Sequence, residues 1–249
     1  MIKHFTALYS PLDIAYNQVM SGPYKDLSVK ADDFEIIAGE KNGKVSGFWR
    51  PMVAIGDVRG IIEDWDIESY LDYLPLGNIS STTKYLLARG YKATAVYACV
   101  INLKCPQWSE VRKSYKSLIN NFKVISDDFQ IYKERHILNH DRTNATYEIQ
   151  RKMAENEQAY VVNGESSSGL FYRNADWSYY ASAVDGGEGL HGVIWNGILR
   201  AEKFGCLYMD LGDLIFSGDL KLKEISFFKT GFGGHIKTRL LLKRKDFNE

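Results

Sequence analysis

The chain lacks several features that mark whole classes of protein. Its longest largely apolar run, 93–103, is too short to cross a bilayer, and residues 1–10 lack the basic and then apolar pattern of a signal sequence. The 31 lysines and arginines equal the 31 aspartates and glutamates, so the chain has no excess positive charge of the kind that a dedicated DNA-binding protein carries. These absences predict a cytoplasmic protein that has no transmembrane segment and does not bind DNA.

Cysteine and histidine are scarce and scattered. Cys99, Cys105 and Cys206 lack Cys-x-x-Cys spacing, so they support neither a disulfide framework nor a zinc site and are interpreted as buried thiols. His136 and His140 have the spacing of one helix face, but no metalloprotease glutamate lies between them, and no metal site is predicted. No nucleophile elbow or Cys–His pair is present either. What remains is direct transfer between two bound substrates, in which positioning and oxyanion stabilisation supply most of the rate.

The chain does contain a regular order of helices and strands. In the first part the patterns predict a helix over 13–20, strands over 34–38 and 45–54 joined by a polar hairpin turn at 39–43, a short helix over 84–89 and a buried strand over 95–103. Three helices are then predicted within 109–121, 127–140 and 145–157. A three-strand meander follows at 159–162, 169–173 and 177–184, and after it come a glycine-rich loop at 185–189, a helix over 190–203 and a strand over 206–211.

One order of elements occurs twice. A turn, a helix, a glycine and a strand follow one another around Gly90 and again around Gly205. This weak internal echo predicts two related halves, residues 1–104 and residues 105–249.

The stretch Ile-Ser-Phe-Phe-Lys-Thr-Gly-Phe-Gly-Gly at 225–234 places one lysine, Lys229, among aromatic residues and follows it with three glycines within four residues. Such a stretch can hold a cation against flat rings while the backbone passes close to a ligand. The other interpretation is a helix end, with the aromatic side chains in the core and the glycines as caps and turn residues. Composition alone leaves both interpretations open.

Two further segments could bind anionic groups. A strand that runs into the loop 185–189 and then into a helix has the geometry of a phosphate site, although Asp185 and Glu188 place negative charge there and favour a plain acidic loop. Arg112, Lys113 and Lys116 form a basic face that is either solvated surface or a site for an acceptor carrying a nucleotide diphosphate. His136 and Arg142 could join this face.

From residue 159 onward the sequence resembles the GNAT (GCN5-related N-acetyltransferase) fold as the Fem-type transferases use it. The resemblance rests on the meander, on Leu190-His-Gly-Val-Ile-Trp195, on Tyr208-Met-Asp-Leu-Gly212 and above all on Phe228-Lys-Thr-Gly-Phe-Gly-Gly234, with the helix at 112–120 opening the catalytic half. Residues 1–104 are similar to the family only in the two-half architecture. The resemblance implies an α+β fold with two GNAT-like halves and a mixed, mostly antiparallel sheet flanked by helices.

The family pattern also implies roles for single residues. Phe228 would help to place the acyl donor, and Lys229 would stabilise the negative charge that develops on the carbonyl oxygen. Asp210 is the best candidate for a general base, while an aspartate that caps the turn at Gly212 is the structural alternative. The acceptor would be an amine of a cell-envelope or polysaccharide precursor such as an amino sugar, bound through Arg112, Lys113, His136 and Arg142.

The identity of the donor stays open. The resemblance implies that a donor pyrophosphate lies against the loop and the following helix start, at Gly186, Gly187, Gly189, Leu190 and His191, but the family's usual Gln/Arg-x-x-Gly-x-Gly/Ala pattern is absent. An acyl-CoA is the leading prediction, because no coiled-coil insertion for holding tRNA is visible, and it would be a co-substrate rather than a permanently bound cofactor. The alternatives are an aminoacyl-tRNA-dependent transferase of the peptidoglycan type and a non-catalytic GNAT-like binding module.

Overall fold

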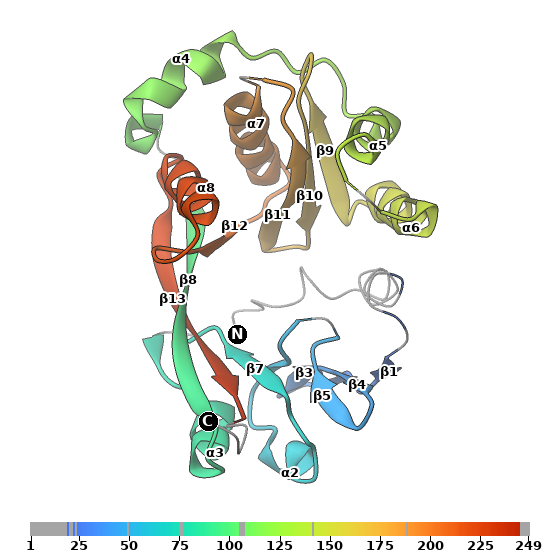
Figure 1. Cartoon of the computed structure of the whole chain (residues 1–249), viewed down its shortest axis with the longest axis vertical. Helices are drawn as coiled ribbons and strands as arrows, with labels where there is room; N and C mark the ends of the chain where they lie inside the picture. The colour runs from blue at the N-terminus through green and yellow to red at the C-terminus, as the bar shows by residue number, and fades with distance from the viewer. Residues whose placement is uncertain are drawn as a thin grey trace. The chain divides into compact units, whose positions relative to one another are not determined.

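A computed structural model describes residues 19, 22, 24–48, 50–74, 77–104, 108–140, 142–187 and 189–244. The described residues form two compact units (Figure 1): unit 1 contains residues 98–237, and unit 2 contains the described residues up to Tyr97 and from Thr238 onward. The predicted division at residue 104 concerned two related halves and stays a prediction, because compactness does not test relatedness. The predicted helix over 13–20 falls outside the described residues except for Val19.

The sheet of unit 1 begins with an antiparallel meander of β9 (Ala159–Asn163), β10 (Ser168–Arg173) and β11 (Trp177–Val184). The helix α7 (Leu190–Lys203) then leads to β12 (Tyr208–Leu214), which runs parallel to β11. The strand β8 (Lys92–Asn102) is the next neighbour of β12 in the strand order. The predicted meander and the predicted helix over 190–203 are therefore confirmed. The strand predicted over 206–211 is β12, which begins at Tyr208.

The strand β10 shows how alternation sorts side chains between the two faces of this sheet. Leu170 and Tyr172 pack in a core cluster with residues of α5 (Phe129–Ile137) and α6 (Asn144–Glu155). On the other face, Phe171 lies against Gly197 of α7, where a side-chain carbon would stand only 2.3 Å from its ring. The sheet of unit 1 is thus covered by α5 and α6 on one face and by α7 on the other.

The helices begin and end at residues that the sequence marks. The side chains of Asp128, Thr143 and Asp219 accept hydrogen bonds at the starts of α5, α6 and α8 (Leu220–Thr230). Gly205 ends α7 with φ +81°, and Gly90 follows α3 (Ser81–Ala88) with φ +86°. The order of elements that the sequence repeats around Gly90 and Gly205 therefore corresponds to a helix, a left-handed glycine and a strand in the structure.

In unit 2 the predicted hairpin turn is confirmed, but it joins different strands from the two that were predicted. Asn42 and Gly43, with φ 55° and 76°, form the tight turn between β4 (Gly39–Lys41) and β5 (Lys44–Ser46). The segment 45–54 does not continue as one strand, because Phe48 adopts φ 65° and the backbone of Gly47 pairs with that of Arg50. As a result β3 (Glu35–Ile37) pairs with a separate strand, β6 (Val53–Ile55).

The remaining elements complete the two units. Unit 2 also contains β1 (Lys25–Asp26), β2 (Val29–Lys30), α2 (Arg59–Ile62) and β7 (Ser69–Asp72), while β13 (His235–Lys243) and β8 each have residues in both units. Unit 1 also contains the short 3-10 helix at Trp108–Glu110 and α4 (Lys113–Asn121). Within the described ranges, each helix is too short or too polar to cross a membrane.

Candidate active site

The parallel strands β11 and β12 pair over only a short distance. Their ladder consists of Trp177 with Tyr208, Ser178 with Met209, and Tyr179 with Asp210. Both strands continue beyond this point, to Val184 and Leu214. Strands that part inside a sheet leave backbone donors and acceptors that are not paired with each other, so a ligand can use them.

Gly212 explains why β12 leaves its partner at this level. Its φ of +84° is a left-handed conformation that residues other than glycine adopt only with strain. The side chain of Asp210 supports the kink, because its Oδ1 accepts a hydrogen bond from the N–H of Gly212 at 2.7 Å. Asp210 is almost fully buried, and its structural role at this turn is the alternative that the sequence left open.

Lys229 reaches this point from the last turn of α8. Its ammonium donates to the carbonyl oxygen of Asp213 at 2.9 Å. The same nitrogen lies 3.2 Å from the place where a side-chain carbon on residue 212 would stand, and the hydroxyl of Tyr179 lies 3.6 Å from that place. The structure therefore brings Lys229 to the level at which β11 and β12 part.

The surroundings of Lys229 affect its charge. Burial lowers the pKa of its ammonium, whereas the nearby acidic groups of Asp213, Asp210 and Cys99 act in the opposite direction. Burial also raises the pKa of the Cys99 thiol to about 12, so this group is neutral and donates to the carbonyl oxygen of Lys229 at 3.6 Å. A partly desolvated ammonium at a fixed position is suited to stabilise an oxyanion.

The three glycines after Lys229 are required by packing. A side-chain carbon would stand 2.1 Å from the ring of Tyr115 at Gly231, 2.7 Å from Cβ of Glu110 at Gly233 and 2.5 Å from the sulfur of Cys99 at Gly234. These glycines admit neighbours from within the protein rather than a ligand. The helix-end interpretation of the stretch is correct for the backbone, since α8 ends at Thr230, and it is compatible with a half-buried lysine in a candidate site.

An aromatic cluster joins the helix ends around this stretch. The ring of Tyr115 lies 4.3 Å from that of His191, 5.3 Å from that of Phe232 and 5.8 Å from that of Phe228. His191 and Phe228 are themselves 5.1 Å apart. Two of the predicted donor-binding residues, Phe228 and His191, are therefore in contact.

The glycine-rich loop before α7 is filled by the chain itself. Asp185 Oδ1 accepts from the N–H of Gly187 and from the hydroxyl of Ser167, both at 3.2 Å, and the N–H of Gly186 donates to the same hydroxyl at 3.3 Å. A carboxylate and a hydroxyl group of the protein thus accept from two of the backbone donors that a phosphate could use. Since a side-chain carbon on Gly186 or Gly189 would collide with Ser166 or Ser167, these glycines also serve close packing. The N–H groups of Gly186 and Gly187 therefore already have partners within the protein.

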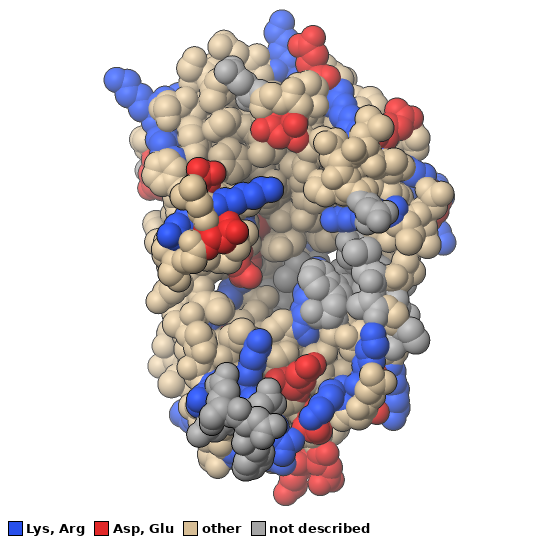
Figure 2. Space-filling model, viewed as in Figure 1, with Lys and Arg blue, Asp and Glu red and all other residues tan. Residues whose placement is uncertain are grey.

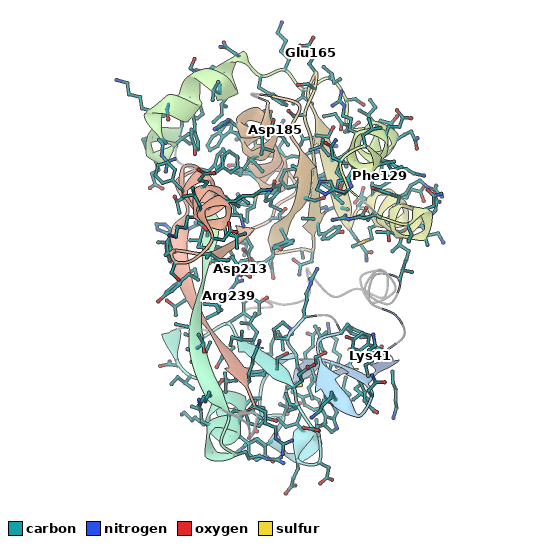
Figure 3. The ribbon with its side chains drawn as sticks, viewed as in Figure 1. Lys41, Phe129, Glu165, Asp185, Asp213 and Arg239 are labelled. Carbon is teal, nitrogen blue, oxygen red and sulfur yellow. The ribbon has the colours of Figure 1, made fainter. Side chains whose placement is uncertain are left out.

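Figure 3 shows that Asp185 lies well away from Asp213, which marks the position of Lys229. Gly186 and Gly187 therefore belong to a different part of unit 1 from Lys229 and Asp210. A hollow of about 600 Å³ lies near this loop. It is lined by Leu118, Asn121, Phe122, Lys123, Ile125, Glu165, Ser166 and Gly189.

Arg135 fixes the turn beside this hollow. Its guanidinium donates to the carbonyl oxygens of Gly164, Glu165 and Ser167 at 2.8, 2.7 and 3.1 Å, and to the hydroxyl of Ser168 at 2.9 Å. Sequence reasoning did not single out Arg135 or Ser167. Neither residue stands in a motif, and only the fold shows that Arg135 reaches the turn between β9 and β10.

The four residues predicted to bind the acceptor do not form one face. Arg112 packs against the end of α8, where its guanidinium lies 3.6 Å from the ring centre of Phe227, and Lys113 is exposed at the start of α4. His136 is fully buried between α5 and α6, with its Nδ1 2.9 Å from the hydroxyl of Tyr147. Figure 1 shows α4 well separated from α5 and α6, and Figure 2 shows both signs of charge interspersed over the visible face.

His136 is also unsuited to bind an anion. Burial, assisted by the charges of Arg142 and His140, lowers the pKa of its imidazole to about 3, so the ring is neutral. Its position places it in the packing between two helices rather than at a surface that an acceptor could reach.

The buried-thiol prediction is confirmed for Cys99 and Cys206, which are free and buried, and Cys105 lies outside the described residues.

Comparison with known proteins gives likenesses of structure only. No protein-family model and no curated protein sequence matches the chain. The crystal structure of FemX superposes with a TM-score of 0.67 at 9% identity and covers 94% of this chain and 91% of that one. The C-terminal domain (DUF2156) of a putative lysylphosphatidylglycerol synthetase from Agrobacterium fabrum has a TM-score of 0.60 at 11% identity, covering 92% of this chain and 87% of that one.

A third structure, L-PGS from Bacillus licheniformis, has a TM-score of 0.55 at 10% identity and covers 95% of this chain and 92% of that one. At these identities the likeness concerns the fold. Since the superposition on FemX covers nearly the whole chain, both units belong to the shared architecture. The predicted Fem-type, GNAT-like α+β fold is confirmed.

Proposed function

We propose that this chain, which has the fold of FemX, is a transferase that moves an aminoacyl or acyl group directly from a bound donor to an amine, with Lys229 as the oxyanion-stabilising residue. The observation that carries the proposal is the position of Lys229. Its ammonium is half-buried, bonded to the carbonyl oxygen of Asp213 and placed where β11 and β12 part.

The chemistry needs few groups. The amine nitrogen bonds to the carbonyl carbon of the donor, and the carbonyl π electrons move to the oxygen, whose negative charge Lys229 stabilises. When the carbonyl re-forms, the bond to the leaving group breaks. The amine nitrogen loses one proton, to Asp210 or to water, and the leaving oxygen or sulfur takes up one proton. Lys229 keeps its own proton throughout.

The donor we propose is an aminoacyl ester rather than an acyl-CoA. In support of this donor, the N–H groups of Gly186 and Gly187 already donate to Ser167 and Asp185, which leaves fewer backbone donors for a CoA pyrophosphate. The name of one structural neighbour, a putative lysylphosphatidylglycerol synthetase, refers to a product that carries a lysyl group, which is an aminoacyl group. The acceptor we propose is an amine of a cell-envelope precursor, as the resemblance in sequence implies.

Transfer assays with two donors test the reaction and the donor together. The purified chain is incubated with radiolabelled aminoacyl-tRNA or with radiolabelled acetyl-CoA, in each case with a panel of amino sugars and lysine-containing peptides as acceptors. We expect transfer from aminoacyl-tRNA and none from acetyl-CoA. The opposite result would overturn the donor assignment and leave the transferase assignment intact.

Lys229→Ala tests the residue, with Lys223→Ala as the matched control because Lys223 is an exposed lysine of the same helix. Loss of one oxyanion donor lowers kcat by roughly 10²–10³-fold. We expect this loss in Lys229→Ala and wild-type rates in Lys223→Ala. A folded Lys229→Ala protein that transfers at the wild-type rate would refute the oxyanion role, and no transfer from either donor by the wild type would favour a binding module.

A further inference from the structure

The start of α4 is tied to the end of α8, the helix that carries Lys229. The N–H of Arg112 donates to the carbonyl oxygen of Gly231 at 2.8 Å, and its Nη2 donates to the carbonyl oxygen of Phe227 at 3.1 Å. The same guanidinium lies 3.6 Å from the ring centre of Phe227. The residue that precedes α4 therefore holds the backbone at the end of α8 on both sides of Lys229.

Tyr115 adds a second tie. Its hydroxyl accepts from Nη1 of Arg112 at 2.8 Å and donates to the carbonyl oxygen of Phe228 at 3.4 Å. Its ring occupies the space that a side chain on Gly231 would need. Arg112 and Tyr115 thus pack together. The guanidinium of Arg112 lies 4.9 Å from the ring centre of Tyr115 and contacts Phe227.

This arrangement addresses a weakness of helix ends. The last four carbonyl groups of a helix have no N–H partner within the helix. The helix end frays easily when only solvent hydrogen-bonds these groups. At the end of α8 the carbonyl oxygens of Phe227, Phe228 and the capping residue Gly231 accept from Arg112 or Tyr115, and that of Lys229 accepts from Cys99. The backbone of this turn is fixed from two sides, by α4 and by β8.

We infer that Arg112, acting with Tyr115, is the positioning residue for Lys229: it holds the last turn of α8 so that the ammonium stays against Gly212 and Asp213. The catalytic consequence rests on the proposed function, whereas the positioning itself does not. A half-buried ammonium keeps its place only while the backbone that carries it is fixed. If the last turn of α8 frayed, the Lys229 side chain would reach water.

The contacts argue against Arg112 as an acceptor-binding residue. Both of its terminal nitrogens already donate within the protein, to Phe227 and to Tyr115, and its planar group lies against an aromatic ring. Two of its five N–H donors are therefore used within the protein, and they hold the group in one orientation against α8. Lysine could not replace Arg112, since a single ammonium lacks the planar fork that serves two acceptors and a ring at once.

The pKa of Lys229 reports on its position without any knowledge of the substrate. The groups that act on this ammonium are Asp213 and Asp210 on β12 and Cys99 on β8, with the Tyr179 hydroxyl of β11 nearby. Burial holds its pKa below the ordinary value of 10.5. If the turn loosens and the ammonium becomes solvated, the pKa must rise toward that ordinary value.

Competitive labelling with acetic anhydride measures this pKa, because only the neutral amine reacts. The wild type and the variants Arg112→Ala, Arg112→Lys and Lys113→Ala are labelled across the alkaline range, and mass spectrometry follows the peptide that contains Lys229. We expect the midpoint for Lys229 to move upward in both Arg112 variants and to stay in place in Lys113→Ala. Arg112→Lys keeps the charge, so its shift cannot arise from the loss of a nearby positive charge.

An unchanged midpoint in folded Arg112→Lys would overturn the inference. If Arg112→Ala fails to fold, Arg112→Lys and Tyr115→Phe still test the positioning role, because Tyr115→Phe removes only the hydroxyl. Both variants must raise the midpoint for Lys229. Under the proposed function, Arg112→Lys also lowers kcat and leaves KM for the acceptor unchanged, whereas a direct binding role would raise KM. A raised midpoint in a protein that transfers from neither donor would refute the proposed function and leave the positioning role in place.

Discussion

Gly212 and Lys229 are complementary: the ammonium nitrogen of Lys229 lies 3.2 Å from the point where a side-chain carbon on residue 212 would stand. The glycine gives β12 the left-handed turn that separates it from β11, and it leaves the space that the lysine occupies. The same residue therefore shapes the backbone of the site and admits its cation.

Gly212→Ala is expected to disturb both features. The backbone strain at φ +84° costs about 1–2 kcal/mol of stability, and the new methyl group must push the Lys229 ammonium aside by a few tenths of an ångström. Gly218→Ala is the matched control, because Gly218 has φ +82° with open space where a side chain would stand. Chemical denaturation should show similar destabilisation of both variants, and only Gly212→Ala should lose transferase activity. Equal activity in the two variants would mean that the space left by Gly212 is not needed to place Lys229 for the reaction.

Gly231→Ala tests the packing at the end of α8. Gly231 has φ −72°, a helical value at which alanine is ordinarily the more stable residue, so the backbone alone predicts a gain. The ring of Tyr115 lies 2.1 Å from the new carbon and predicts a loss instead, of roughly 1–3 kcal/mol as for other overpacked sites. Thermal or chemical unfolding decides the sign.

Combining Gly231→Ala with Tyr115→Ala supplies the control for this interpretation. If the clash is the cause, the double variant is destabilised by less than the sum of the single changes, since the second change removes the atom that the first one meets. Strictly additive losses would place the cause elsewhere.

Local order along the chain could be predicted because local patterns determine it. The aromatic and β-branched residues of β9, β10 and β11 are separated by polar turns, and α7 ends at Gly205 because a left-handed residue stops a helix. The helix end that carries Lys229 could also be predicted, from one short motif at the end of α8. Each of these features is encoded within a few neighbouring residues.

Partners that lie far apart in the sequence could not be predicted. Cys99 is 130 residues from Lys229, and Arg112 is 115 residues from Phe227, yet these pairs are in contact. The assignment of Arg112 to the acceptor followed from its basic neighbours, because charge in sequence does not reveal which guanidinium groups the protein uses internally. The loop at 185–189 had the expected glycines, and only the structure shows that Ser167 and Asp185 occupy its donors.

Asp210→Asn distinguishes a turn-capping aspartate from a general base. An asparagine retains the oxygen that accepts from the N–H of Gly212, so the kink should survive with a small change in stability. We expect transfer rates within about threefold of wild type, since water can take the proton from the amine. Asp210→Ala, which removes the oxygen, should lose about 1–3 kcal/mol of stability and the activity with it. A stable Asp210→Asn protein that has lost its activity would make Asp210 the base.

The same substitution has a consequence for pH dependence. The carboxylate of Asp210 raises the pKa of Lys229 against the larger effect of burial, so its removal must lower that pKa further. The protonated ammonium is the active form in the proposed reaction, and activity is lost as pH rises through its pKa. The alkaline limb of kcat should therefore lie below 10.5 in the wild type and at still lower pH in Asp210→Asn.

His136 should make the protein sensitive to acid. Its imidazole is fully buried beside Tyr147, and burial lowers its pKa to about 3 from 6.5. Between these two values the unfolded chain binds a proton that the folded protein does not, so the free energy of unfolding falls as pH falls from about 6.5 toward 3. The contribution is at most about 1.4 kcal/mol per pH unit.

His136→Asn isolates this contribution, because asparagine can still bond to the Tyr147 hydroxyl and does not titrate. Urea unfolding between pH 7 and pH 4 should give a shallower fall in stability for His136→Asn than for the wild type, whatever the stability of the variant at neutral pH. Since carboxylates titrate in both proteins, their share cancels in the comparison. His140→Gln removes the ring 4.1 Å from that of His136 and a charge that makes a small contribution to the lowered pKa of His136, so it should keep most of the wild-type slope. Parallel slopes for His136→Asn and the wild type would mean that His136 accepts its proton in the folded protein.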